Sequence, residues 1–151
     1  MITILAIGKK HEKWVSEGIE RYEQRLKGAY SVMWRFLAHS SLEETAARRE
    51  ESARILEALG ERDFVVLLDE TGDIWSTPQL ESTLSRQLTL GANIVLVIGG
   101  AYGVDERLKA RADAVWSLSK LVFPHQLVRL ILVEQLYRAQ SIAAGHPYHH
   151  T

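Results

Sequence analysis

The chain of 151 residues contains no cysteine, which excludes disulfides, thiolate metal ligands and a cysteine nucleophile. No apolar run approaches the roughly 18 residues that a membrane-spanning helix requires. The apolar N-terminal stretch stops at Gly8 and has no basic segment before it, so it predicts a first strand and not a signal peptide. We therefore expect a cytoplasmic protein that does not enter a membrane.

Common cofactor motifs are missing as well. There is no GxGxxG after the first predicted strand and no GxxxxGK followed by Ser or Thr, so neither a dinucleotide site nor a P-loop is supported. HExxH does not occur, and the histidine-rich tail over 146–150 has no cysteine or carboxylate nearby, so we expect no metal. The net charge of −1 does not indicate a nucleic-acid-binding protein. Any RNA site must therefore depend on local charge, and we expect it in the histidine-rich C-terminal part.

Short apolar runs alternate with segments of helical periodicity along the whole chain. The predicted strands are 2–7, 32–37, 64–68, 93–98 and 114–118. The predicted helices are 11–26, 41–59, 77–90, 105–112 and 126–144. This alternation predicts an α/β fold with a mainly parallel sheet and helices on both faces. No repeat or linker divides the chain, so we expect a single domain over 1–151.

Three of these helices carry further predictions. Thr77 followed by Pro78 predicts the N-cap and first position of the third helix. The second helix has a predicted apolar stripe formed by Leu42, Ala46, Ala53, Leu56 and Leu59. We interpret the charged residues of its other face as solvent-exposed; these are Glu43, Glu44, Arg48, Arg49, Glu50 and Glu51. The helix over 126–144 is apolar nearly all round, which favours a homodimer built on it, although deep packing within a monomer is the alternative.

Ligands of open α/β sheets bind at the carboxyl ends of the strands. Three loops lie at such ends, over 67–72, 98–103 and 116–125. Glycines at a strand end let a ligand approach the backbone closely, but the pair Gly99 and Gly100 could equally mark only a tight turn.

Six segments at these and neighbouring positions carry a resemblance to a known family. They are Asp73–Leu80, Leu96–Gly100, Trp116–Ser119, Pro124–Arg129, Glu134–Ala139 and His146–His149. In this order and spacing the sequence resembles, over essentially its whole length, the RlmH (YbeA-type) ribosomal RNA methyltransferases of the SPOUT superfamily. Two positions depart from the family pattern. Ala101 stands where proline is common, and His150 stands where arginine often follows the first histidine of the tail.

The resemblance implies a SPOUT-type fold with a C-terminal trefoil knot and a homodimer assembled through the knotted region. It implies an enzyme that uses S-adenosyl-L-methionine (SAM) to methylate N3 of a pseudouridine in large-subunit rRNA of the assembled ribosome. The implied cofactor contacts come from the same three loops. They are Leu68, Gly99, Gly100, Gly103, Leu118, Ser119, Lys120, Leu121, Val122 and Phe123.

Methylation at a ring nitrogen requires removal of a proton, because a neutral imide nitrogen is a poor nucleophile. Candidate catalytic residues are His125, Tyr148 and His149, each of which could also be structural. Candidate RNA contacts are Arg129, His146 and His150. The absence of cysteine excludes the covalent route used to methylate pyrimidine carbons.

Other functions remain open at this point. The chain could methylate another RNA such as tRNA, bind ribosomes without catalysis, or bind a nucleotide or flavin, although the missing phosphate motifs count against the last.

We expect that valine at Gly99 or Gly100 abolishes SAM binding and leaves the fold intact. Calorimetric titration of the folded variants with SAM measures this, and retained affinity would remove these glycines from the site.

Overall fold

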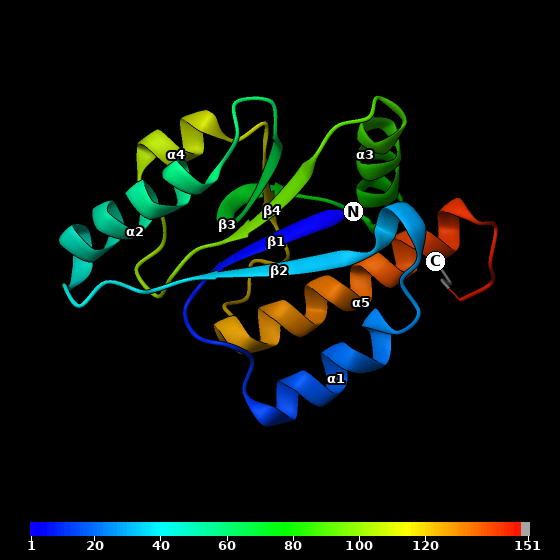
Figure 1. Ribbon diagram of the computed structural model, residues 1–151, viewed down its shortest axis with the longest axis horizontal. Coiled ribbons are helices and arrows are strands. Elements are labelled where there is room, and N and C mark those ends of the chain that lie inside the picture. Colours follow the sequence, from blue (N-terminus) through cyan, green and yellow to red (C-terminus); the bar gives the residue numbers. More distant parts are fainter. Residues whose placement is uncertain (149–151) are drawn as a thin grey trace.

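All five strands of the sheet run parallel, in the order β2-β1-β4-β3-β5, in the computed structural model, which describes residues 1–148 (Figure 1). The strands are β1 (Ile2–Ile7), β2 (Val32–Leu37), β3 (Phe64–Ile74), β4 (Ile94–Ile98) and β5 (Ala114–Ser117). The helices are α1 (Lys13–Glu23), α2 (Glu44–Ala58), α3 (Thr77–Thr89), α4 (Glu106–Arg111) and α5 (His125–Ala143), with a short 3₁₀ turn at Gly28–Tyr30. The predicted single α/β unit with a parallel sheet is confirmed.

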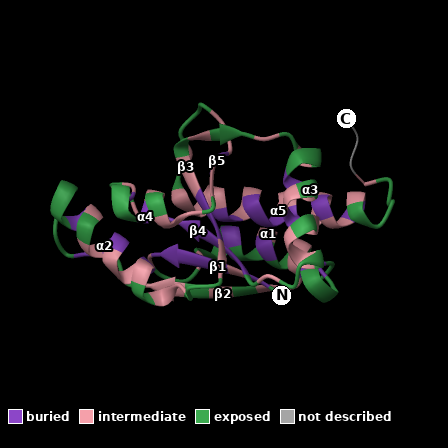
Figure 2. Ribbon diagram, turned by 90° about the horizontal axis from the view of Figure 1, so that it is seen from above, coloured by how far each residue is buried: buried purple, intermediate pink, exposed green. Residues whose placement is uncertain are grey.

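Helices cover both faces of the sheet, because successive side chains of each strand point to opposite sides. In β1, Ile4 enters the core cluster with α1, α3 and α5, whereas Leu5 enters the one with α2 and α4. Both side chains are almost fully buried. Figure 2 shows buried residues along the strands and on the sides of the helices that face them.

Helix α5 occupies the centre of one layer, where it packs against both α1 and α3. Gly18 in α1 permits a close approach, since a Cβ there would lie 3.0 Å from Leu130 of α5. Burial against the sheet and these helices explains much of the apolar character of α5. Leu127 and Ile131 nevertheless remain partly exposed. The trefoil knot stays a prediction.

The predicted apolar stripe on α2 is confirmed only in part, since Leu56 and Leu59 pack against the core whereas Ala46 is exposed. The buried residues are Ala47, Glu51, Ser52 and Ile55, while Leu42 precedes the helix and is 46% exposed. Small and polar side chains fill this face because α2 packs closely on α4, where the Ser52 hydroxyl accepts a hydrogen bond from the backbone N–H of Asp105 at 2.9 Å.

The cap of α3 also differs by one residue from the prediction. Ser76, not Thr77, is the N-cap, and it forms a capping box with Gln79 in which each side chain accepts a hydrogen bond from the other's backbone N–H. Thr77 instead donates its hydroxyl to Gln135 of α5 at 2.7 Å. Pro78 follows in the first turn, as predicted. Over residues 1–148, none of the helices has both the length and the apolar character to cross a membrane.

Replacing Ser76 with alanine removes the hydroxyl of the capping box and should lower the free energy of unfolding by about 1 kcal/mol. Chemical denaturation followed by circular dichroism measures the change. Ser41→Ala is the matched control, because Ser41 is exposed and makes no side-chain hydrogen bond within the described residues. Equal stability of the Ser76 and Ser41 variants would contradict a stabilising role of the cap.

Candidate functional site

A cavity of about 560 Å³ lies at the carboxyl edge of the sheet. Its position follows from the strand register, in which Leu68 of β3 pairs with both Ile98 of β4 and Trp116 of β5. Past this row β4 ends at Ile98, and β3 shifts register before it pairs with β5 again at Asp73 and Ile74. The cavity opens between these segments and the loop after β5. The volume lies in the range of small-molecule sites.

The lining of this cavity contains almost every residue that the resemblance assigned to the cofactor. Those present are Leu68, Gly99, Gly100, Gly103, Leu118, Ser119, Leu121, Val122 and Phe123. Lys120 lies in the same loop but is not among the lining residues. His125, one of the predicted catalytic residues, also lines the cavity.

Hydrogen bonds within the loops shape the walls. The N–H of Gly103 donates to the carbonyl of Gly100 at 3.0 Å, and Gly103 takes a φ of +76°, which favours glycine. In the loop after β5, the Ser117 hydroxyl donates to the carbonyl of Ser119 at 2.9 Å, and the Ser119 hydroxyl accepts from the N–H of Leu121 at 3.0 Å. The loop is thereby folded over the cavity even though its Leu121 side chain is 71% exposed.

The two adjacent glycines are required by packing of the protein itself. A Cβ on Gly99 would lie 2.8 Å from the side chain of Val104, and a Cβ on Gly100 would lie 2.3 Å from Oε1 of Glu51. The expectation that valine at Gly100 leaves the fold intact is therefore wrong, because the side chain would collide with a buried carboxylate.

His125 is the first residue of α5 and lines the cavity. Burial lowers the pKa of its imidazole and the positive charge of Arg129 lowers it further, whereas the Gly99 backbone and Glu51 act in the opposite direction. The imidazole is therefore neutral at neutral pH, the form that can accept a proton.

Four buried side-chain atoms in the described residues have no hydrogen-bond partner. They are Glu51 Oε1, Trp116 Nε1, His125 Nδ1 and Arg129 Nε. Trp116 and His125 line the cavity, Glu51 lies against Gly100, and Arg129 is one helical turn beyond His125. Buried polar atoms are normally paired, so unpaired ones need an explanation. Their concentration at this end of the sheet marks it as the candidate functional site.

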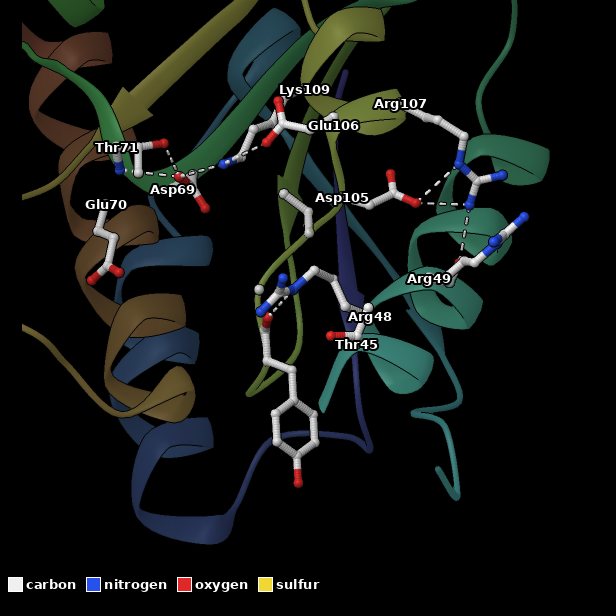
Figure 3. Close-up of a pocket in the computed structure, with 13 residues that line it drawn as sticks. Thr45, Arg48, Arg49, Asp69, Glu70, Thr71, Asp105, Glu106, Arg107 and Lys109 are labelled. Atoms are coloured by element: carbon white, nitrogen blue, oxygen red, sulfur yellow. Dashed lines mark hydrogen bonds and ion pairs between the residues drawn. The ribbon is translucent and has the colours of Figure 1, made fainter. Parts of the chain in front are cut away.

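A second cavity of about 640 Å³ adjoins the first and shares Arg48, Asp69 and the segment Tyr102–Val104 with it. Figure 3 shows charged side chains of α2 and α4 around it, including Arg49, Arg107 and Lys109. The Arg48 Nε donates to the carbonyl of Tyr102 at 2.8 Å, which ties α2 to the loop after β4. Sequence reasoning missed Arg48, because it lay in a charged run that we interpreted as solvent-exposed.

Similarity to known proteins agrees with this geometry. The family model described as "Predicted SPOUT methyltransferase" matches residues 1–149. The protein named Ribosomal RNA large subunit methyltransferase H of Heliobacterium modesticaldum is 41% identical over 158 residues, covering 98% of each chain. A protein of the same name from Marinomonas sp. is 38% identical over 152 residues, covering 98% of each chain. Another from Thioalkalivibrio sulfidiphilus is 41% identical over 152 residues, covering 98% of this chain and 97% of the relative.

The chain belongs to the SPOUT methyltransferase family. The resemblance drawn from the sequence is confirmed over the full length, including the relationship to the H-type rRNA methyltransferases.

The buried position of Arg129 in this SPOUT methyltransferase does not fit the predicted contact with RNA. The residue is 2% exposed, its Nη1 donates to the carbonyl of Lys9 at 2.8 Å, and its guanidinium lies 5.1 Å from the ring centre of Phe36. A Cβ on Gly8 would lie 3.2 Å from its Nη2. The guanidinium therefore joins the loop after β1 to the first turns of α5.

The tail of the methyltransferase lies at the far end of α5 from the cavity. Tyr148 donates to Glu134 at 3.4 Å, and its ring packs against Tyr137 with centres 4.5 Å apart. Burial raises the pKa of Tyr148, so its hydroxyl is a donor and not a base at neutral pH. His146 is exposed, and His149 and His150 lie outside the described residues.

The structure does not bring His125 and Tyr148 together within one chain. Tyr148 folds back on α5 and contacts Glu134 and Tyr137, nine and twelve residues after His125, so about 14 to 18 Å of helix lies between Tyr148 and His125 at 1.5 Å per residue. Over residues 1–148 there is no group of three or more His, Asp and Glu side chains that could hold a metal.

Replacing Arg129 with alanine should lower the free energy of unfolding by about 3 kcal/mol, because it removes a buried hydrogen bond and leaves a void. Thermal and urea denaturation measure the loss. Arg86→Ala is the matched control, since Arg86 is exposed at the end of α3, and its effect should stay within about 0.5 kcal/mol. A stable Arg129 variant would argue instead for a role outside folding.

Proposed function

We propose that this SPOUT methyltransferase transfers a methyl group from SAM to large-subunit rRNA. The observation that carries the proposal is the cavity at the carboxyl edge of the sheet, whose lining comes from the three loops that the family resemblance assigns to the cofactor. The names of the relatives, which are rRNA large subunit methyltransferases, supply the acceptor.

The residues around the cavity suit SAM. Its volume of about 560 Å³ accommodates a nucleoside with an amino-acid side arm. Within residues 1–148 the indole N–H of Trp116 is a buried donor without a partner, and the apolar Leu68, Leu118 and Phe123 offer surface for a base. SAM supplies a methyl group activated on a positively charged sulfur. The protein's part is to hold donor and acceptor in line and to exclude water.

His125 is the described residue best placed to accept the acceptor's proton. Its imidazole is neutral at neutral pH and lies in the wall of the cavity. N3 of pseudouridine, the acceptor that the family resemblance implies, carries a proton that must leave before the nitrogen attacks. The hydroxyl of Tyr148 stays protonated and can donate a hydrogen bond to an oxygen of the RNA.

A homodimer accounts for two features of the single chain. Leu121 and Val122 beside the cavity are 71% and 82% exposed, and Leu127 and Ile131 continue this apolar surface along α5. A second copy could bring its tail to the cavity, whereas Tyr148 of the same chain packs on α5 at Glu134 and Tyr137. We place this dimer in the cytoplasm, where it meets the assembled ribosome.

Titration calorimetry should show saturable SAM binding by the purified protein. Ala101→Trp should weaken that binding at least tenfold, because the exposed Ala101 lines the cavity and the indole would fill it. Ala46→Trp, at an exposed position of α2 outside both cavities, should bind as the wild type does. Labelled SAM should then transfer its methyl group to unmodified ribosomes, with 3-methylpseudouridine in the nucleoside digest.

Other results would replace the proposal. Methylation of tRNA but not of ribosomes would change the acceptor. Association with ribosomes without any methyl transfer or SAM binding would make the protein a non-catalytic ribosome-binding module.

A further inference from the structure

Glu51 is a buried acid on a helix whose charged residues otherwise face outward. It is 4% exposed, and its Oε2 accepts a hydrogen bond from the backbone N–H of Ser40 at 2.8 Å. Its Oε1 is also buried but has no hydrogen-bond partner among the described residues. A carboxylate placed in this way costs free energy that a neutral side chain of the same size would not. Anchoring the loop at Ser40 does not require this charge, because an amide oxygen could accept the same hydrogen bond.

The unpartnered oxygen lies directly behind the wall of the cofactor cavity. A Cβ on Gly100 would lie 2.3 Å from Oε1, so the carboxylate is in contact with the backbone of the turn after β4. Ile7 packs at the same point, 3.2 Å from that Cβ position. Glu51 therefore supports the Gly99–Gly100 turn from the side opposite the cavity.

The same carboxylate acts on His125. Burial and Arg129 have the largest effects on the pKa of this histidine and lower it, whereas the Gly99 backbone and, to the smallest extent, the negative charge of Glu51 raise it. The other charged groups at the cavity are Arg48 from α2 and Asp69 and Glu70 from β3. Glu51 is the only acid that contributes to the pKa of His125 in the described structure.

Resting on the function proposed above, we propose that Glu51 is a positioning residue of the methyl-transfer site, whose buried carboxylate holds the Gly99–Gly100 turn in place beside His125 for the proton transfer to that histidine. In that step the N3–H bond of the acceptor breaks and its proton moves to His125. The N3 electron pair forms the new bond to the methyl group, and the pair of the broken carbon–sulfur bond stays on sulfur. The imidazolium later returns its proton to water.

Glu51→Gln tests the proposal, because glutamine keeps the volume and the acceptor for Ser40 but removes the charge. The variant should be at least as stable to urea as the wild type and bind SAM with an affinity within about threefold of it. Its kcat for methyl transfer should fall about 10- to 100-fold, less than the roughly 100- to 10,000-fold that a general base contributes, because His125 itself is still present. The pKa of His125, followed by NMR of its ring proton, should be lower than in the wild type.

Glu50→Gln is the matched control on the same helix. Glu50 is half-exposed and, in the part of the chain that the structure describes, pairs only with Arg54, so loss of its charge should change neither kcat nor the titration of His125. In a His125→Gln background the Glu51→Gln substitution should have no further effect on kcat, because the two residues act through one step.

The outcomes separate this proposal from the proposed function. Wild-type kcat and an unshifted His125 titration in Glu51→Gln would overturn the role of Glu51 while methyl transfer itself stands. Failure of Glu51→Gln to fold would overturn it too, since Glu51 would then be a structural residue. Absence of methyl transfer by the wild type would refute the proposed function. The NMR titration would still report whether Glu51 acts on His125.

Discussion

The position of the site depends on one buried guanidinium. Arg129 reaches from α5 to the loop after β1, where it donates to the carbonyl of Lys9 and packs on Phe36. The loop can meet it because Gly8, at a φ of +124°, leaves room for the guanidinium. Since Arg129 follows His125 by one helical turn, the contact that fixes the start of α5 also fixes the histidine in the cavity wall.

The order of helices and strands could be predicted because parallel strands buried on both faces are continuous apolar runs. The run over 64–68 and the one ending at Ile98 were such cases, and both are strands of the structure. The continuation of β3 to Ile74 could not be predicted, because Asp69, Glu70 and Thr71 are polar. The pairing of β3 with β5 shifts register across this polar stretch. The alternation of apolar and polar residues in a sequence does not reveal such a shift.

The cavity could be located from sequence, because a parallel sheet brings the ends of its strands to one edge. The residues that lie behind the cavity could not be predicted from the sequence. A row of charged residues on α2 has the pattern of a solvated face, and only the packed structure shows that Glu51 turns inward and that Arg48 lies between two cavities. Arg129 was misassigned for a related reason. An arginine beside histidines resembles an RNA contact in sequence, while its burial depends on residues more than a hundred positions away.

The central place of α5 has a consequence for synthesis of the protein. Leu132, Val133 and Leu136 from this last helix complete the core cluster that contains Ile4 of the first strand. A ribosome-bound chain that has not yet released α5 leaves part of this face of the sheet uncovered, so the layer cannot close until α5 emerges. Nascent or truncated chains that lack α5 therefore present an apolar sheet face to chaperones and proteases.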